Sequence, residues 1–199
     1  MKSSYLRAGA ALACALMLSA CGGSDGNMLL GGTYYGVTKS GLVLTNNGGS
    51  DLAIEPTGTG MGEFFFKDLV DTDDRYDVQI KPGTKPSNAS ECKVFNGSGR
   101  VVYDVRTIRV ECTLKQHELK GTITGLTGAN LVLVNGSDQV AVPAGATSFA
   151  MAKINEDAPY GITVLTQPDN QTCTVANGSG TMGANDVTNV AVTCGPRTQ

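Results

Sequence analysis

The sequence predicts an all-β fold built from two small β-sandwiches in tandem, and three observations support this prediction. The chain repeats itself internally, short alternating strands fill both copies, and Asn-Gly pairs separate many of these strands. No stretch of useful length has the period of an amphipathic helix. With 199 residues, 41% of them hydrophobic, the chain is long enough for two small domains with packed cores.

The internal repeat decides the fold class. Four blocks recur in the same order in both halves, at an offset that drifts because the loops differ in length. The clearest block is a Cys-x-Val-x-Asn-Gly-Ser-Gly motif, followed by a strand that ends in a second cysteine. It occupies 92–112 in the first copy and 173–194 in the second. The earlier blocks pair 42–46 with 131–135 and 76–80 with 160–164.

Each copy is about 80 residues long and contains the pattern of a small sandwich. Residues 139–142 and 190–194 alternate larger apolar side chains with small or polar ones, which is typical of a strand with one buried face. Asn-Gly pairs favour tight turns because both residue types tolerate positive φ. About six to eight short strands per unit predict two immunoglobulin-like sandwiches in tandem. The Asn-Gly pairs lie at 47–48, 96–97, 135–136 and 177–178.

The chain begins with a secretory signal. Lys2 and Arg7 form a positive segment, and the apolar stretch 8–18 follows. This stretch is shorter than the roughly 20 residues that a membrane-spanning helix needs. We therefore expect a signal peptide over 1–20 rather than a permanent membrane span.

The end of the signal, Leu18-Ser19-Ala20-Cys21, resembles a bacterial lipobox. The resemblance implies that the signal is cut before Cys21, that the Cys21 sulfur receives a diacylglycerol, and that the new amino terminus is acylated. Gly22 follows the cysteine, whereas Asp at that position often marks inner-membrane retention in such lipoproteins. The expected location is therefore the outer membrane, facing the periplasm or the cell exterior. The alternative is an ordinary signal with a chance cysteine near its cleavage site.

We expect four segments after the signal. A Gly-rich, flexible tether covers 21–32, and the first immunoglobulin-like repeat covers 33–113. A short polar linker at 114–119 joins it to the second repeat at 120–195. A linker of this length predicts domains that sit end to end with limited swing.

The cysteines agree with the repeat. Of the six, one leaves with the signal and Cys21 carries lipid, so two remain in each repeat. An exported protein sits in a compartment that permits disulfides, which predicts the pairs Cys92–Cys112 and Cys173–Cys194. Each would close a loop of about 20 residues and contribute roughly 3 kcal/mol. The alternative is a four-thiolate metal site, but the sequence contains no Cys-x-x-Cys pair.

The Cys-x-Val-x-Asn-Gly-Ser-Gly block with its closing Val-x-Val-x-Cys resembles a repeat of predicted surface or periplasmic lipoproteins of Gram-negative bacteria. The resemblance covers most of 33–195. It implies an immunoglobulin-like, non-catalytic module and brings no catalytic residues. The first repeat is the more divergent copy, with Glu111 where the second has Thr193.

Phe64, Phe65 and Phe66 form the most suggestive binding feature. Aligning the repeats sets Phe65 opposite Phe149 at a core position, and strand alternation then turns Phe64 and Phe66 to the other face. Phe64 and Phe66 are therefore candidate contacts with a partner or with the second repeat. The alternative is a one-residue bulge or gap that places both rings in the core.

An acidic cluster is the weak candidate for a calcium site, because carboxylates are the hard oxygen ligands that Ca²⁺ takes. It lacks the Gly and the closing Glu of an EF-hand loop, so a solvated turn is the alternative. The sequence contains a single histidine, His117, and no hydrolase or phosphate-loop motif, so we expect neither a catalytic residue nor a cofactor. The cluster consists of Asp71, Asp73, Asp74 and Asp77.

The expected function is a non-catalytic lipoprotein that acts as a binding or structural module at the cell envelope. Its partners would be the membrane, through the lipid, and an envelope or surface protein. A net charge of −3, from 15 basic and 18 acidic residues, gives no basic face for nucleic acid. Three alternatives stay open: a periplasmic inhibitor or immunity-type protein, an adhesin or filament component, and a small enzyme.

Overall fold

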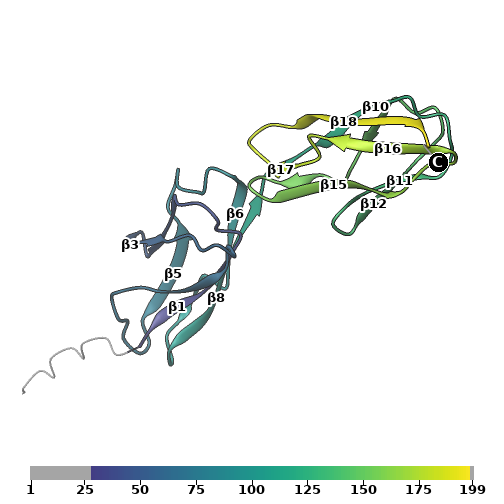
Figure 1. Ribbon diagram of the computed structural model, residues 1–199. Coiled ribbons are helices and arrows are strands. Elements are labelled where there is room, and N and C mark those ends of the chain that lie inside the picture. Colours follow the sequence, from purple (N-terminus) through teal and green to yellow (C-terminus); the bar gives the residue numbers. More distant parts are fainter. Residues whose placement is uncertain (1–27, 198–199) are drawn as a thin grey trace, which may run out of the picture.

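The structure is a computed structural model that describes residues 28–197. Every regular element of these residues is a β-strand, which confirms the prediction of an all-β sandwich fold. The strands form two sandwiches, each of two four-stranded sheets. Figure 1 shows the two sandwiches end to end, with the first strand of each next to its last.

The first sandwich contains eight strands. Its two sheets have the strand orders β4-β1-β8-β6 and β3-β2-β5-β7. The strands are β1 Leu30–Tyr35, β2 Leu42–Asn46, β3 Gly49–Ile54, β4 Gly62–Phe65, β5 Arg75–Ile80, β6 Ala89–Phe95, β7 Ser98–Arg100 and β8 Val105–Leu114.

The second sandwich has the corresponding sheets, β13-β10-β18-β16 and β12-β11-β15-β17, and a two-stranded ribbon of β14 and β9 lies at its start. The strands are β9 Gln116–His117, β10 Leu119–Thr124, β11 Leu131–Asn135, β12 Asp138–Val142, β13 Ser148–Ala150, β14 Ile154–Asn155, β15 Pro159–Thr166, β16 Gln171–Ala176, β17 Ser179–Thr181 and β18 Val187–Pro196.

The two sandwiches share one topology, strand for strand. In both, the first and last strands pair in parallel at the centre of one sheet, whereas the other pairings are antiparallel. Even the irregularity in the parallel pair recurs: the register shifts between Leu30 and Gly32 in β1, and between Leu119 and Gly121 in β10. The sequence repeat is therefore also a structural repeat.

Each sandwich encloses its own core. Leu44 and Ile108 lie in the first and are at most 1% exposed, while Leu133 and Val190 occupy the corresponding places in the second and are fully buried. Residues of the first core run from Leu30 to Cys112 and those of the second from Leu119 to Cys194, with no member in common. The hydrophobic effect therefore stabilises the two units separately.

The structure differs from the expected tether, because the strand β1 already begins at the fully buried Leu30. Gly32 lies opposite Ile108 in the parallel pair, and a Cβ atom there would overlap the Ile108 carbonyl oxygen. Gly121 stands in the same relation to Val190. The Gly31-Gly32 pair, which composition marks as flexible, instead allows two backbones to approach closely.

The expected linker at 114–119 is also largely ordered as strand. The strand β8 continues to Leu114, and β10 begins at Leu119, which is 0% exposed. Between them, Gln116–His117 pairs with Ile154–Asn155 of the second sandwich. The connection between the sandwiches is therefore a paired segment and not a free chain.

Candidate functional site

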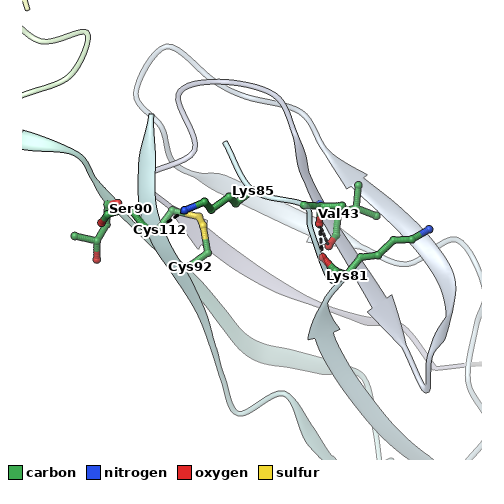
Figure 2. The surroundings of a disulfide bond; sticks show 8 residues. Val43, Lys81, Lys85, Ser90, Cys92 and Cys112 are labelled. Atoms are coloured by element: carbon green, nitrogen blue, oxygen red, sulfur yellow. Dashed lines mark hydrogen bonds between the residues drawn. A yellow bond between two sulfur atoms is a disulfide. The ribbon is translucent and has the colours of Figure 1, made fainter. Parts of the chain in front are cut away.

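Two disulfides attach the edge strands β6 and β16 to the last strand of each sandwich. Cys92 is bonded to Cys112, and Cys173 to Cys194, in the pairs that the repeat predicts. The partners lie directly opposite each other in antiparallel register, with Cα atoms 4.0 Å apart in each pair. Figure 2 shows the Cys92–Cys112 disulfide. Each bond therefore joins two strands of one sheet and does not cross between sheets.

The predicted lipidation site, Cys21, lies outside the described residues, as do the signal peptide and most of the tether. The structure does show where the chain that follows Cys21 meets the first sandwich. Met28 forms a two-way bridge with Val70, through backbone hydrogen bonds of 3.1 and 3.0 Å. Leu29 accepts a hydrogen bond from the Val105 amide at 2.8 Å. We call this end, made of residues 28–29, 67–74 and 101–104, the N-terminal pole.

Asp104 fixes the chain at the N-terminal pole. Its Oδ1 accepts a hydrogen bond from the Leu29 amide at 2.9 Å, and its Oδ2 accepts one from Arg106 Nη2 at 3.2 Å. The Leu29 bond and then the Arg106 contact lower the pKa of Asp104 below its ordinary value of 3.8. Because the folded pKa is lowered, ionised Asp104 stabilises the pole at neutral pH. This contribution is lost as the pH falls below 3.8 through the lowered value.

We expect Asp104→Ala to expose the Leu29 amide to solvent, because that amide loses its acceptor. Hydrogen exchange at Leu29 then becomes several-fold faster at neutral pH, and the protection of this amide no longer decreases as the pH falls through the pKa of Asp104. Asp104→Asn is the matched control, since its side-chain oxygen still accepts the Leu29 bond and should restore most of the protection. Exchange at Leu29 that is the same in all three proteins would contradict this role for Asp104.

The prediction that Phe64 and Phe66 form an exposed contact is wrong. Phe64 is 5% exposed and Phe66 is 4% exposed, and both belong to the first core. Their rings pack edge to face, with centroids 6.2 Å apart. Phe65 is the ring that points outward, and the Arg106 guanidinium lies 5.1 Å from its centroid.

The error arises because the sequence alignment of the two repeats is displaced by one residue at this strand. Phe149 lies opposite Gly121 in the second sandwich, and Phe64 lies opposite the corresponding Gly32 in the first. Phe64, and not Phe65, is therefore the equivalent of Phe149. The chain then turns inward after β4, where the Phe66 amide donates to the Leu30 carbonyl oxygen at 2.8 Å.

The acidic cluster does not gather into a ligand set. Asp73 pairs with Arg100 at 3.2 Å, and Asp74 accepts a hydrogen bond from the Asp71 amide at 3.3 Å. Asp77 lies in β5 and accepts a hydrogen bond from Gln79. Within residues 28–197 no group of three or more His, Cys, Asp or Glu side chains is placed to hold a metal ion. The stretch 71–74 forms a turn, closed by the Asp74 amide on the Asp71 carbonyl oxygen at 3.2 Å.

Polar side chains of both sandwiches meet at the junction between them. Asn88 is fully buried, and its Nδ2 donates to Thr38 Oγ1 at 2.7 Å and to Asp157 Oδ2 at 2.9 Å. Lys39 Nζ lies 3.0 Å from the same Asp157 oxygen and 3.4 Å from Glu156 Oε1. The hydrogen bond with Asp157 raises the pKa of Lys39 above its ordinary value of 10.5. The first sandwich thus contacts the β14–β15 turn of the second through the side-chain amide of Asn88 and the ammonium group of Lys39.

Backbone hydrogen bonds and a contact between His117 and Glu156 reinforce this junction. The Lys115 amide donates to the Asn88 carbonyl oxygen at 2.9 Å, and the Glu156 amide donates to the Lys115 carbonyl oxygen at 2.8 Å. The Glu156 side chain is 6% exposed, and its Oε2 lies 3.4 Å from His117 Nε2. Sequence reasoning missed this site, because Lys39 and Asn88 look like ordinary loop residues. The only signal is the short acidic stretch that contains Glu156.

Two hollows of the surface lie near the ends of the second sandwich. A hollow of about 330 Å³ at the junction is lined in part by Thr57, Glu156 and Asp157. A hollow of about 590 Å³ at the far end has no ionisable side chain in its lining, which consists of Asn130, Leu131, Val132, Ala141, Val142, Pro143 and Thr166. No helix among the residues that the structure describes is long and apolar enough to cross a membrane.

Comparisons with known proteins do not assign a family. The sequence matches no protein-family model, and no curated protein is significantly similar to it. Similar solved structures include one protein of Bacillus anthracis and several pilus proteins of other bacteria. The Bacillus anthracis TIE protein is 12% identical, with a TM-score of 0.42 over 83% of this chain and 34% of that one, so the chain spans about a third of its length.

Two pilus proteins are similar over nearly their whole length. A C-terminal fragment of the pilus adhesin SpaC from Lactobacillus rhamnosus GG is 11% identical, with a TM-score of 0.42 over 87% of this chain and 99% of the fragment. The major pilin T3.2 of Streptococcus pyogenes is 12% identical, with a TM-score of 0.36 over 87% of this chain and 99% of the pilin. At these scores the similarity carries no argument about family or function.

Proposed function

We propose that this chain is a non-catalytic lipoprotein of the outer membrane, attached through acyl chains on Cys21 after removal of residues 1–20. Its two sandwiches form one stiff arm at the cell envelope. The arm presents its second sandwich to an envelope or surface protein, and it requires no cofactor. This role depends on attachment to the membrane and on the shape of the two-domain arm.

The contacts at the junction are the observation that carries this proposal. Lys39 and Asn88 of the first sandwich engage Glu156 and Asp157 of the second, and the buried Asn88 has little freedom to move. Breaking the Asn88–Asp157 hydrogen bond leaves a donor of the buried Asn88 amide unpaired, which costs about 1–3 kcal/mol. Together with the β9–β14 pairing, these contacts support a fixed angle between the sandwiches.

The direction of the strands supports attachment at one end and presentation at the other. The parallel strands β1 and β8 both begin at the N-terminal pole, where Leu30 lies opposite Val105. The strand β8 then runs the length of the sandwich, and the chain enters the second sandwich just after Leu114. The second sandwich therefore lies at the end of the arm away from the N-terminal pole, where the described chain begins, as Figure 1 shows.

The two disulfides support an exported location. Such bonds form and persist in oxidising compartments such as the bacterial periplasm and are rare in the cytosol. Each of the two described disulfides joins cysteines of the same repeat, one disulfide per repeat, at sequence separations of 20 and 21 residues. The signal and the lipobox resemblance at Cys21 agree with this location.

We expect Cys21→Ala to abolish the incorporation of labelled palmitate, because the sulfur that accepts the diacylglycerol is gone. The uncleaved precursor should accumulate, and no mature protein should appear in the outer-membrane fraction. Metabolic labelling followed by membrane fractionation measures all three effects.

Cys14→Ala is the matched control, since it removes the other cysteine of the signal segment and should leave labelling and cleavage unchanged. Palmitate incorporation into the Cys21→Ala protein at the level of the unchanged chain would refute the anchor.

A further inference from the structure

Exposed apolar side chains gather at the N-terminal pole. Tyr103 and Val102 are 74% and 63% exposed, and they are the two most exposed of the large hydrophobic residues that the structure describes. Leu69 is 48% exposed. Side chains of this kind that protrude together from loops mark contact surfaces more often than scattered single ones do.

These side chains flank the place where the chain leaves toward Cys21. Leu69 directly precedes Val70, whose backbone bridges Met28. Tyr103 directly precedes Asp104, whose carboxylate holds the Leu29 amide. The two exposed loops therefore lie on either side of the first described residues.

The length of the chain between Cys21 and Met28 limits how far this pole can lie from the anchor. Only six residues separate the two. A fully extended chain of this length reaches at most about 25 Å, and a flexible Gly-rich chain typically spans about 15 Å. Because β1 begins at Leu30, the segment between Cys21 and the first strand is shorter than the tether that composition predicts.

We propose that Leu69, Val102 and Tyr103 dock the N-terminal pole onto the lipid surface in which the acyl chains of Cys21 are embedded. The inference rests on the proposed lipid anchor. Tyr is well suited to this place, because its ring is apolar and its hydroxyl reaches the headgroup region. The contact sets the arm at a defined angle to the membrane.

Weak individual contacts are sufficient here, because the anchor makes docking an intramolecular event. A short flexible linker gives an effective concentration in the millimolar range. A surface whose affinity for membranes is too low for binding on its own therefore still contacts the lipid. Three side chains of modest size match this requirement.

Charge at the pole favours a neutral lipid surface over an anionic one. Acidic side chains outnumber basic ones there, and several are already engaged: Asp104 with Arg106, Asp73 with Arg100, and Asp68 with Ser50. The charged side chains at and next to the pole are Lys67, Asp68, Asp71, Asp73, Asp74, Arg100, Asp104 and Arg106.

Tryptophan substitution tests this docking, because the chain contains no native Trp. Lipidated protein is purified from membranes and placed in phosphatidylcholine vesicles whose acyl chains carry bromine, a contact quencher. We expect the emission of Tyr103→Trp and Leu69→Trp to fall to roughly half of its value in unbrominated vesicles, as expected for side chains at the headgroup and acyl boundary.

Two exposed positions away from the pole serve as matched controls. Tyr35→Trp lies in the same sandwich, at the opposite end of β1, and its native side chain is 41% exposed. Leu165→Trp lies near the end of β15 in the second sandwich, and its native side chain is 53% exposed. The emission of both should be unchanged by bromine.

Mass spectrometry of the N-terminal peptide from the same samples separates the two claims. Acylated protein whose Trp at 103 and 69 is not quenched overturns the docking surface and leaves the anchor in place. Equal quenching at all four positions also overturns it, since the contact would not belong to this pole. An unmodified Cys21 overturns the anchor and the docking together.

Discussion

Replacing Phe64 by alanine is expected to lower the free energy of unfolding of the first sandwich by about 3–5 kcal/mol. The ring is 5% exposed, packs edge to face on Phe66 and belongs to the core. Truncation removes its buried apolar surface and leaves a cavity that β4 and β1 cannot close without losing their pairing. Chemical denaturation, followed by tyrosine fluorescence, measures the loss.

Phe65→Ala is the matched control, because it removes the same side chain from the next position of the same strand. Its ring is partly exposed under Arg106, so the expected loss is below about 1 kcal/mol. If Phe65→Ala were the more destabilising of the two, the position of this strand in the core would be wrong.

Removing one disulfide should have the second large effect. The double substitution Cys92→Ala and Cys112→Ala is expected to cost the first sandwich roughly 3 kcal/mol, since the bond closes a loop of 20 residues. For a domain of about 80 residues, this corresponds to a decrease in Tm of roughly 12–24 °C. Differential scanning calorimetry under non-reducing conditions measures the change.

The second sandwich provides the control for this experiment. Cys173→Ala with Cys194→Ala should destabilise that sandwich by a similar amount, because its loop is of nearly equal length, at 21 residues. Each double variant should shift mainly the transition of its own sandwich. One shared transition that moves equally in both variants would argue that the cores are not separate.

Local patterns in the sequence predict the strands and turns well. Val190 and Val192 alternate with the small or polar residues Asn189, Ala191 and Thr193, and both valines are buried in β18. The Asn47-Gly48 pair connects β2 to β3 with φ values of 51° and 74°, as such a pair favours. The cysteine pairs follow from the repeat, because the same motif precedes and follows each loop.

Long-range pairing is what the sequence does not reveal. The parallel pairing of β1 and β8 joins residues about 75 positions apart. The alternation of side chains along a strand does not indicate which other strand lies next to it. Lys39 and Glu156 are 117 positions apart, and no local pattern relates them. The junction therefore appears only once the fold is known.

The remaining differences arise where one residue type serves two purposes. Gly31 and Gly32 look like flexible chain, yet in β1 the missing Cβ of Gly32 makes room for the Ile108 backbone. The three consecutive phenylalanines leave the register undetermined by one position, and a shift of one residue reverses every inward and outward face. Only the pairing of Gly32 with Phe64 resolves it.

The most direct test of this account is peptide mapping, by mass spectrometry without reduction, of the protein isolated from the membrane fraction. Trypsin cuts between Cys92 and Cys112, and cleavage at Asp186 separates Cys173 from Cys194, so each bond joins two distinct peptides. We expect an acylated peptide that begins at Cys21 and two disulfide-linked pairs of peptides, each within one repeat. A bond between the repeats, or an unmodified amino-terminal peptide, would contradict it.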